Sequence, residues 1–286
     1  MPLLMTATAM LTRRFFSLLL KAVRADCVCD IGSRDAEESL FFRHLLPDAV
    51  VLAFEASLSN YEMMVAREDL RANRIEILPY AVCSRNGRAT FYVIDDQADK
   101  DTMRQLHHIP QSEDVEKILR GSSSLLSHEG PTPIKQNVEV ETRRIDDFIL
   151  GQYPSMKRIG LWIDVEGAEY DVLEGMAKIQ DRVVALHVET ARTPMRIGQR
   201  TNDELLCLAA SMGFVLCGSN MGAHDNWGDA VFLSQKSIES LGWKFTFLKL
   251  VDMMGLLLKK HAPWLDRKLI DFVSPLQDPK RHTPRR

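Results

Sequence analysis

Acidic residues close several of the short apolar segments in this sequence, and such positions can bind a ligand. Asp30 lies near the end of "CVCDI", Glu55 follows "VVLAF", Asp164 follows "IGLWI" and Glu189 ends "VVALHVE". If these segments are parallel strands, their carboxyl ends meet at one edge of a sheet, where open α/β proteins bind ligands. We therefore expect the four carboxylates to lie near one another and to favour a ligand that carries positive charge.

The turn after the first segment, "DIGSRDAEES", contains a single glycine, Gly32. A dinucleotide-binding turn holds a pyrophosphate at a helix N-terminus and uses several neutral glycines to do so. This turn instead brings four acids near the site, Asp30, Asp35, Glu37 and Glu38. Acids at a helix N-terminus match its dipole, but they also repel a pyrophosphate. The turn therefore favours S-adenosylmethionine, which carries a sulfonium and an ammonium and no phosphate.

Glu55 supports this interpretation because it ends the second apolar segment. An acid at that position can accept hydrogen bonds from both ribose hydroxyls of an adenosine. It would repel a phosphorylated ribose, which speaks against NADP. The third segment ends in the small apolar residues around Ala81, which could flank an adenine ring or belong to the core.

Seven short apolar segments run along the chain, with amphipathic stretches between several of them. The segments are 27–31, 50–56, 75–82, 159–165, 183–189, 214–218 and 230–234. The amphipathic stretches are 35–46, 57–72, 168–179 and 202–212. Strands that alternate with helices in this way predict an α/β fold with a mostly parallel, seven-stranded sheet. The last two segments leave no room for a helix between them, so we expect them to be antiparallel.

The alternation of apolar segments and amphipathic stretches is interrupted between residues 83 and 158. Segments 88–93 and 138–145 alternate apolar and polar residues, as half-exposed strands do. Residues 95–137 are polar, with three consecutive serines and two prolines, and they predict a long functional loop inserted in the domain.

Both ends of the chain predict helices outside this core. Residues 12–23, "TRRFFSLLLKAV", resemble an export signal, but Lys21 interrupts the apolar run and no cleavage site follows. We expect an amphipathic helix over 1–24 and the main domain over 25–235. Residues 236–286 predict a helical extension with a basic tail. It either packs on the domain or contacts a membrane surface or a second copy of the chain through 236–273.

Charge and hydropathy exclude two classes of protein. A formal net charge of −3 is unlike the basic footprint of a dedicated nucleic-acid-binding protein. No apolar run reaches the roughly 18 residues that a membrane span needs. We expect a cytoplasmic protein that is at most peripheral at the inner face of a membrane.

Six stretches, in this order, resemble the FkbM family of S-adenosylmethionine-dependent methyltransferases: "VCDIGSRDAEES", "LAFEAS", "YAVCSRNGRATFYV", "GSSSL", "VETRRIDDFI" and "LWIDVEGAEYDVLEGM". The resemblance implies a Rossmann-like class I methyltransferase fold with helices on both faces of the sheet. It also implies O-methylation of hydroxyls on sugars, glycans or natural products. The resemblance assigns Asp30, Gly32 and Glu55 to the cofactor, with Ala81 beside it, and we add Ser33 and Ala56 as further candidate cofactor residues.

Two positions depart from the family pattern. The family commonly has a further glycine where Ala36 stands, and alanine is the mildest replacement. It often has a lysine where Trp162 stands. If that lysine touches substrate, the substrate of this protein differs; if it faces the flank of the sheet, the change is structural.

Methyl transfer to a hydroxyl needs either a base that accepts the hydroxyl proton or a metal ion that stabilises the negative charge left on the oxygen. Asp164 and Glu189 are our candidates for base and orienting group, with Glu166 in reserve. The same carboxylates could instead hold Mg²⁺. We expect Glu169 to serve the start of the following helix and His187 to be a core residue.

The acceptor is expected to be a small molecule or a glycan, in a pocket shaped by residues 95–137. Two other functions stay open from the sequence. An NAD-dependent oxidoreductase on the same fold is disfavoured by the acidic turn with its single glycine. A non-catalytic binding protein that keeps the fold is disfavoured by the acids at successive strand ends.

Overall fold

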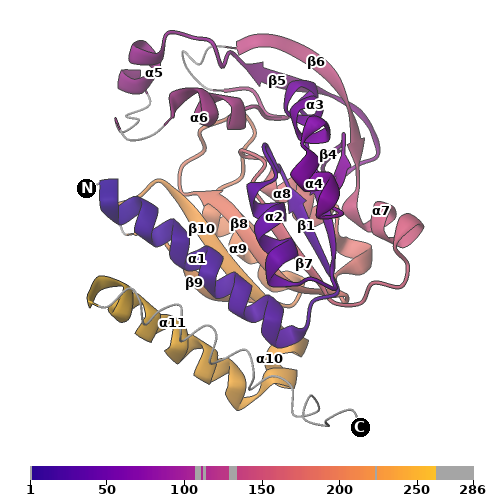
Figure 1. Cartoon of the computed structure of the whole chain (residues 1–286), viewed down its shortest axis with the longest axis vertical. Coiled ribbons are helices and arrows are strands. Elements are labelled where there is room, and N and C mark those ends of the chain that lie inside the picture. Colours follow the sequence, from indigo (N-terminus) through magenta and orange to yellow (C-terminus); the bar gives the residue numbers. More distant parts are fainter. Residues whose placement is uncertain (1, 107–110, 112–113, 129–133, 223, 262–286) are drawn as a thin grey trace.

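A seven-stranded β-sheet forms the centre of the protein in a computed structural model (Figure 1). The structure describes residues 2–106, 111, 114–128, 134–222 and 224–261. Side chains are described for 12–104, 111, 114–128, 134–222 and 224–252. Across the sheet the strands are β3 (Glu76–Leu78), β2 (Val50–Phe54), β1 (Cys27–Ile31), β7 (Ile159–Ile163), β8 (Val183–Ala191), β10 (Trp227–Ser234) and β9 (Phe214–Ser219).

The strands are buried on both faces, which is why most of them are nearly continuous apolar runs. Alternate residues of a strand enter two separate cores: Cys27, Cys29 and Ile31 of β1 pack in one, and Val28 packs in the other. The first core is covered by α7 (Ile145–Gln152), α8 (Glu169–Glu174) and α9 (Asn202–Ser211). The second is covered by α1 (Pro2–Val23), α2 (Glu37–Leu45), α3 (Leu58–Ala66), α4 (Glu68–Ala72), α10 (Gln235–Leu241) and α11 (Trp243–His261).

The predictions for this sheet are confirmed. Each of the seven apolar segments contains a strand, and β10 is antiparallel to both β8 and β9. The helix bounds differ from expectation. The stretch 57–72 forms two helices because the backbone is extended at Arg67. In the stretch 168–179 the α-helix ends at Glu174, and a separate 3₁₀ turn follows at Ala177–Ile179.

Helix α1 is part of the second core. Its Phe15, Phe16, Leu19 and Leu20 are buried, so the segment that resembles an export signal is an amphipathic helix packed on the sheet. Gly160 of β7 makes room for it, since a Cβ at that position would stand 2.4 Å from the Leu20 side chain.

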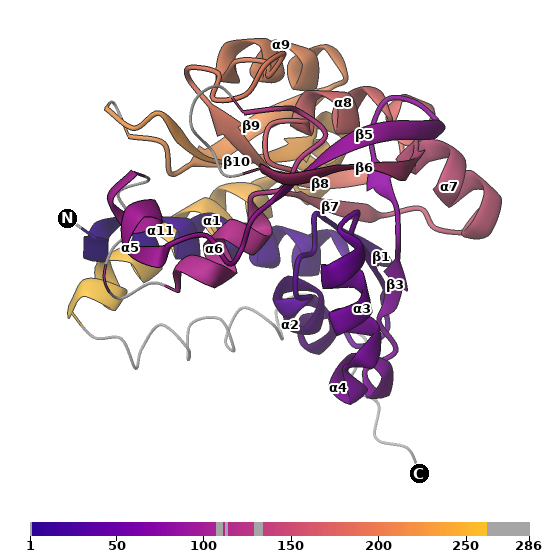
Figure 2. The ribbon, with the colours of Figure 1, turned by 90° about the horizontal axis from the view of Figure 1, so that it is seen from above.

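The prediction of a loop over 95–137 is wrong in part. The segment contains α5 (Lys100–Leu106) and α6 (Val115–Gly121), which pack through a small core of Ile94, Met103, Val115 and Leu119. Val115 and Leu119 lie at helical spacing, but Ile94 and Met103 are distant from them in sequence, so no local pattern signals the contact between the helices. The protein also contains a second sheet of three strands, in the order β4 (Ala81–Val82), β6 (Ile134–Arg143) and β5 (Gly87–Ile94). Seen from above in Figure 2, β5 and β6 lie across the large sheet.

The C-terminal helices α10 and α11 contact α1, and Figure 1 shows α11 running beside it. Trp243 at the start of α11 is 74% exposed and Leu250 is 51% exposed. Among the helices that the structure describes, none combines the length and apolar character needed to cross a membrane. The basic tail expected after residue 261 lies outside the described residues.

Gly32 connects the turn after β1 to the end of β7. It has a positive φ of 86°, and a Cβ there would stand 1.7 Å from the carbonyl oxygen of Asp164. The Asp164 N–H donates a hydrogen bond to the Ile31 carbonyl at 2.9 Å. The two backbones are therefore in direct contact, and only glycine fits between them.

We expect Gly32→Ala to lower the free energy of unfolding by about 2–5 kcal/mol, because left-handed backbone strain of about 1–2 kcal/mol adds to an overpacking cost of about 1–3 kcal/mol. Gly213→Ala is the matched control. Gly213 also has a positive φ, of 82°, but an added Cβ meets nothing within 4 Å. Urea titration measures both variants, and equal losses would contradict the close-contact argument.

Candidate active site

A cavity of about 500 Å³, including its open mouth, lies beyond the carboxyl ends of β1, β2 and β7. Residues from β5 and from the end of α6 complete its walls. The residues expected at the site that line it are Gly32, Glu55, Ala56, Ala81 and Asp164. The expected residues outside its lining are Asp30, Ser33, Glu166 and Glu189.

Glu55 is buried in the cavity wall, with 6% of its surface exposed. Its Oε2 accepts a hydrogen bond from the Arg34 N–H at 2.7 Å, and its Oε1 accepts one from the Ser57 N–H at 2.7 Å. These bonds fix the carboxylate between two turns. Burial raises the pKa of Glu55 to about 7. Each oxygen has a second lone pair, so the carboxylate can still accept two ribose hydroxyls.

Asp30 holds the first turn and is not in the cavity wall. Its side chain is buried, and its Oδ2 accepts hydrogen bonds from the hydroxyls of Ser33 at 2.8 Å and Ser39 at 2.6 Å. Burial raises the pKa of Asp30. The contacts of Asp30 and Ser33 shape the turn that carries Gly32. Ala36, at the family's glycine position, has a φ of 58°, the left-handed conformation that glycine adopts without strain.

Apolar walls flank the cavity close to Glu55. Ala56 and Ala81 pack with Phe91 and Leu125, and all four line the cavity. Apolar walls beside a hydrogen-bond acceptor suit a purine ring attached to a ribose. The sequence pattern did not indicate Phe91 and Leu125, because their position over the cavity depends on the packing of the second sheet.

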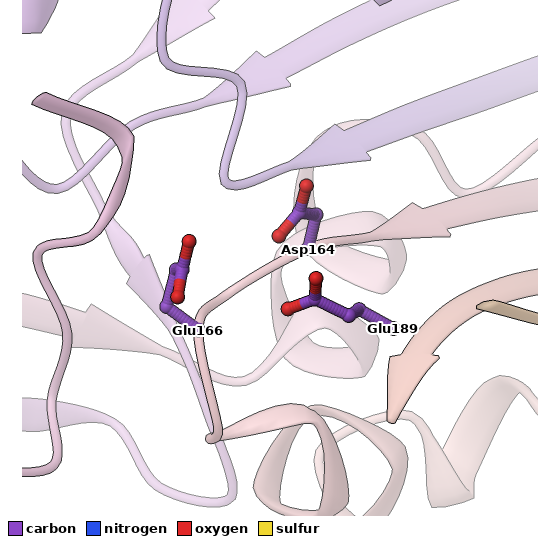
Figure 3. Close-up of side chains that lie close together, drawn as sticks. All are labelled: Asp164, Glu166 and Glu189. Carbon is purple, nitrogen blue, oxygen red and sulfur yellow. The ribbon is translucent and has the colours of Figure 1, made fainter. Parts of the chain in front are cut away.

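Asp164, Glu166 and Glu189 form an acidic cluster at the end of β7 and in the adjoining strand β8 (Figure 3). One carboxylate oxygen from each residue lies within 4.8 Å of the others. β7 is two strands across the sheet from β2, which Glu55 follows. The tertiary structure therefore brings these three predicted residues together at one place on the sheet edge.

Crowding of these carboxylates favours their protonated forms. Asp164 reaches solvent at the cavity mouth, yet the surrounding protein and the nearby carboxylates, Glu166 foremost, hold its pKa well above its usual range. Burial and the charge of Asp164 likewise hold the pKa of Glu189 well above its usual range. Two carboxylates this close do not both ionise readily, so the pair can hold one proton and keep one charge.

Arg196 is the ion-pair partner of Glu166 in this cluster. It comes from the loop after β8, is 3% exposed and forms an ion pair with Glu166. It also donates a hydrogen bond to the Ser122 carbonyl at 3.2 Å. Glu166 is thereby tied to two loops. Asp164 in the cavity lining and Glu189 beside it have no ion-pair partner among the described residues. A single arginine in a loop carries no local sequence signal, so this partner was not predicted.

The cluster offers the oxygen ligands that Mg²⁺ prefers. The guanidinium of Arg196 already neutralises Glu166, and a metal ion beside it would meet that positive charge. The described residues therefore do not by themselves make a magnesium site.

Trp162 and His187 lie on the α1 side of the sheet. Their rings stack with centroids 3.5 Å apart and planes 8° apart, and Phe16 packs edge-on against both. The change from the family's lysine to Trp162 is therefore structural. Burial lowers the pKa of His187 to about 3, so it is a neutral core residue, as predicted. Glu169 accepts the N–H groups of Val165 and Gly167 and so serves the turn before α8.

A mostly parallel sheet with helices on both faces and a cavity beyond the carboxyl ends of its central strands defines a Rossmann-like α/β protein. Residues 30–216 match the model of the methyltransferase FkbM domain. The chain belongs to the FkbM methyltransferase family, and it is an enzyme that uses S-adenosylmethionine as methyl donor.

Two relatives illustrate the similarity. The chain is 26% identical over 212 residues to 2-O-methyltransferase NoeI of Sinorhizobium fredii (strain NBRC 101917 / NGR234), across 73% of this chain and 81% of that protein. It is 24% identical over 165 residues to Methyltransferase 1 of Beauveria bassiana (strain ARSEF 2860), across 52% of this chain and 57% of that protein. Neither relative favours the oxidoreductase alternative.

We expect S-adenosylhomocysteine to bind about tenfold more tightly at pH 8 than at pH 6. The ribose hydroxyls prefer the ionised form of Glu55, and a carboxyl with a pKa of about 7 ionises across that interval. Glu55→Gln should bind more weakly and lose this pH dependence. Calorimetry at several pH values measures both effects.

Glu38→Gln is the control, because burial also raises the pKa of Glu38 to about 7 although it does not line the cavity. A flat wild-type profile would refute the ribose assignment.

Proposed function

We propose that the protein methylates a hydroxyl group on a small hydroxylated acceptor, such as a sugar, a glycan or a natural product. The observation that carries the proposal is that Asp164 lines the cofactor cavity and has the Glu189 carboxylate close beside it, outside the lining. A hydroxyl nucleophile must give up its proton, and this pair can receive it. The 2-O-methyltransferase name of one relative supports the same type of acceptor.

S-adenosylmethionine supplies an electrophilic methyl group carried on a sulfonium. In the proposed reaction Glu55 and the apolar walls fix the adenosine, and the acceptor hydroxyl enters next to Asp164 at the cavity mouth. Asp164 takes the hydroxyl proton while the new O–C bond forms and the C–S bond breaks. Glu189 shares that proton and orients Asp164. Alignment of the two reactants can contribute about 7–11 kcal/mol in favourable cases.

Asp164→Asn is expected to lower kcat by about 10²- to 10⁴-fold, the usual contribution of a general base. Its affinity for S-adenosylhomocysteine should change far less. The variant should also fold at least as stably as wild type, since it removes one of several crowded charges. Asp171→Asn is the control, because Asp171 lies in α8, pairs with Ser84 and does not line the cavity. Retained turnover in Asp164→Asn would remove Asp164 from the reaction.

The acceptor class is tested with radiolabelled S-adenosylmethionine on glycans, hydroxylated metabolites and protein. We expect label in the first two, in a form stable to mild alkali, because a methyl ether resists hydrolysis and a methyl ester does not. Activity should persist in EDTA, since one of the three candidate metal ligands, Glu166, is already paired with Arg196. Alkali-labile label, or label in protein alone, would overturn the hydroxyl proposal, and loss of activity in EDTA would show that a metal ion takes part.

A further inference from the structure

A second cavity of about 450 Å³, including its open mouth, adjoins the cofactor cavity. It lies between the start of α3, the end of α6 and the strands β5 and β6. Arg120 and Ser123 line both cavities. The proposed methyl transfer does not use it.

Arg120 brings a positive charge to this cavity that no carboxylate within the described residues neutralises. Its Nη1 faces the Met63 sulfur, a weak acceptor, at 3.4 Å. Its Nε is buried, and the described residues give it no hydrogen-bond partner. A guanidinium held partly away from water without an anion costs free energy, and an anion in the cavity would offset that cost.

Lys135, on β6, adds a second cation. Its ammonium lies 3.9 Å from the Asp96 carboxylate, and its side chain is 52% exposed. An ion pair this long and this exposed contributes little, so Lys135 can turn to a stronger anionic partner. With two cations and one carboxylate, the described lining of the second cavity keeps one net positive charge.

Hydroxyl groups complete the lining. Ser57 is the N-cap of α3, and its hydroxyl lies 3.0 Å from that of Ser59, which is in the first turn of the helix. The partial positive charge of a helix N-terminus adds to that of the two cations. The Ser123 hydroxyl accepts the Ile94 N–H at 3.1 Å, so its own hydrogen can still be donated.

We propose that this second cavity binds an oxyanion group, such as a phosphate or sulfate, carried by a hydroxylated ligand. Arg120 and Lys135 bind the oxyanion, and Ser57, Ser59 and Ser123 meet the remaining oxygens. Neither Asp164 nor Glu189 lines this cavity. It is therefore an additional binding position and not the place where the acceptor hydroxyl reacts.

Inorganic phosphate and glucose 6-phosphate are the probes, with glucose as the neutral comparison. At constant ionic strength, we expect both phosphates to raise the melting temperature of the full chain above its value in chloride. Calorimetry should show glucose 6-phosphate binding more tightly than inorganic phosphate and no binding of glucose alone. If inorganic phosphate binds as tightly as glucose 6-phosphate, the glucose hydroxyls take no part in binding, and the proposal of a hydroxylated ligand is overturned. If neither phosphate binds, the whole proposal fails.

Lys135→Gln should weaken glucose 6-phosphate binding by about tenfold, the effect of losing roughly one charge-assisted hydrogen bond. It should leave S-adenosylhomocysteine affinity unchanged, which separates this site from the cofactor cavity. Asp96→Asn should strengthen phosphate binding, a gain that misfolding cannot produce. Lys157→Gln is the control, because Lys157 is exposed beside the amino end of β7, at the opposite edge of the sheet. Equal phosphate responses in all the variants would overturn the proposal.

Discussion

Gly32 stands so close to the end of β7 that its missing side chain decides how the site is assembled. The contact with the Asp164 carbonyl joins the turn after β1 to the strand end that carries the acidic cluster. Glu55 accepts the N–H of Arg34, two residues further along the same turn, and so ties in the end of β2. This backbone contact and this side-chain bond add to the parallel ladders of β1 with β2 and β7, and so connect the ends of the three strands. The positions of the adenosine walls and of the Asp164 carboxylate depend on these connections.

Negative charge is concentrated at this edge of the sheet, and few cations of the described residues lie close enough to neutralise it. Arg196 is buried and forms an ion pair with Glu166, one of the three clustered acids. Asp164 and Glu189 keep no such partner among the described ion pairs. Their raised pKa values follow from burial and from the charges of neighbouring carboxylates, chiefly Glu166 for Asp164 and Asp164 for Glu189. Charge that is left uncompensated at a cavity is typical of a site that binds a ligand or moves a proton.

Much of the fold could be predicted, because a buried parallel strand has a local signature. The seven apolar segments from Cys27 to Ser234 needed only hydrophobicity and spacing to be recognised. The strand-end positions of Glu55 and Asp164 followed from the same pattern, and both line the cavity. Asp30 was placed at the correct edge, but its side chain turns to Ser33 and Ser39. Strand position alone does not say which hydrogen bonds a carboxylate makes.

The sequence by itself determined the α/β class, the order of strands along the chain, the resemblance to the FkbM family and the acids at the sheet edge. Only the tertiary structure decided which residues from distant segments meet them. Arg196, Phe91 and Arg120 come from a loop, a second sheet and an inserted helix, and each reaches a cavity or the acidic cluster through long-range packing. Apolar periodicity is a local property that the chain carries residue by residue. Contacts of a single arginine or phenylalanine depend on how whole elements pack, and no local pattern records them.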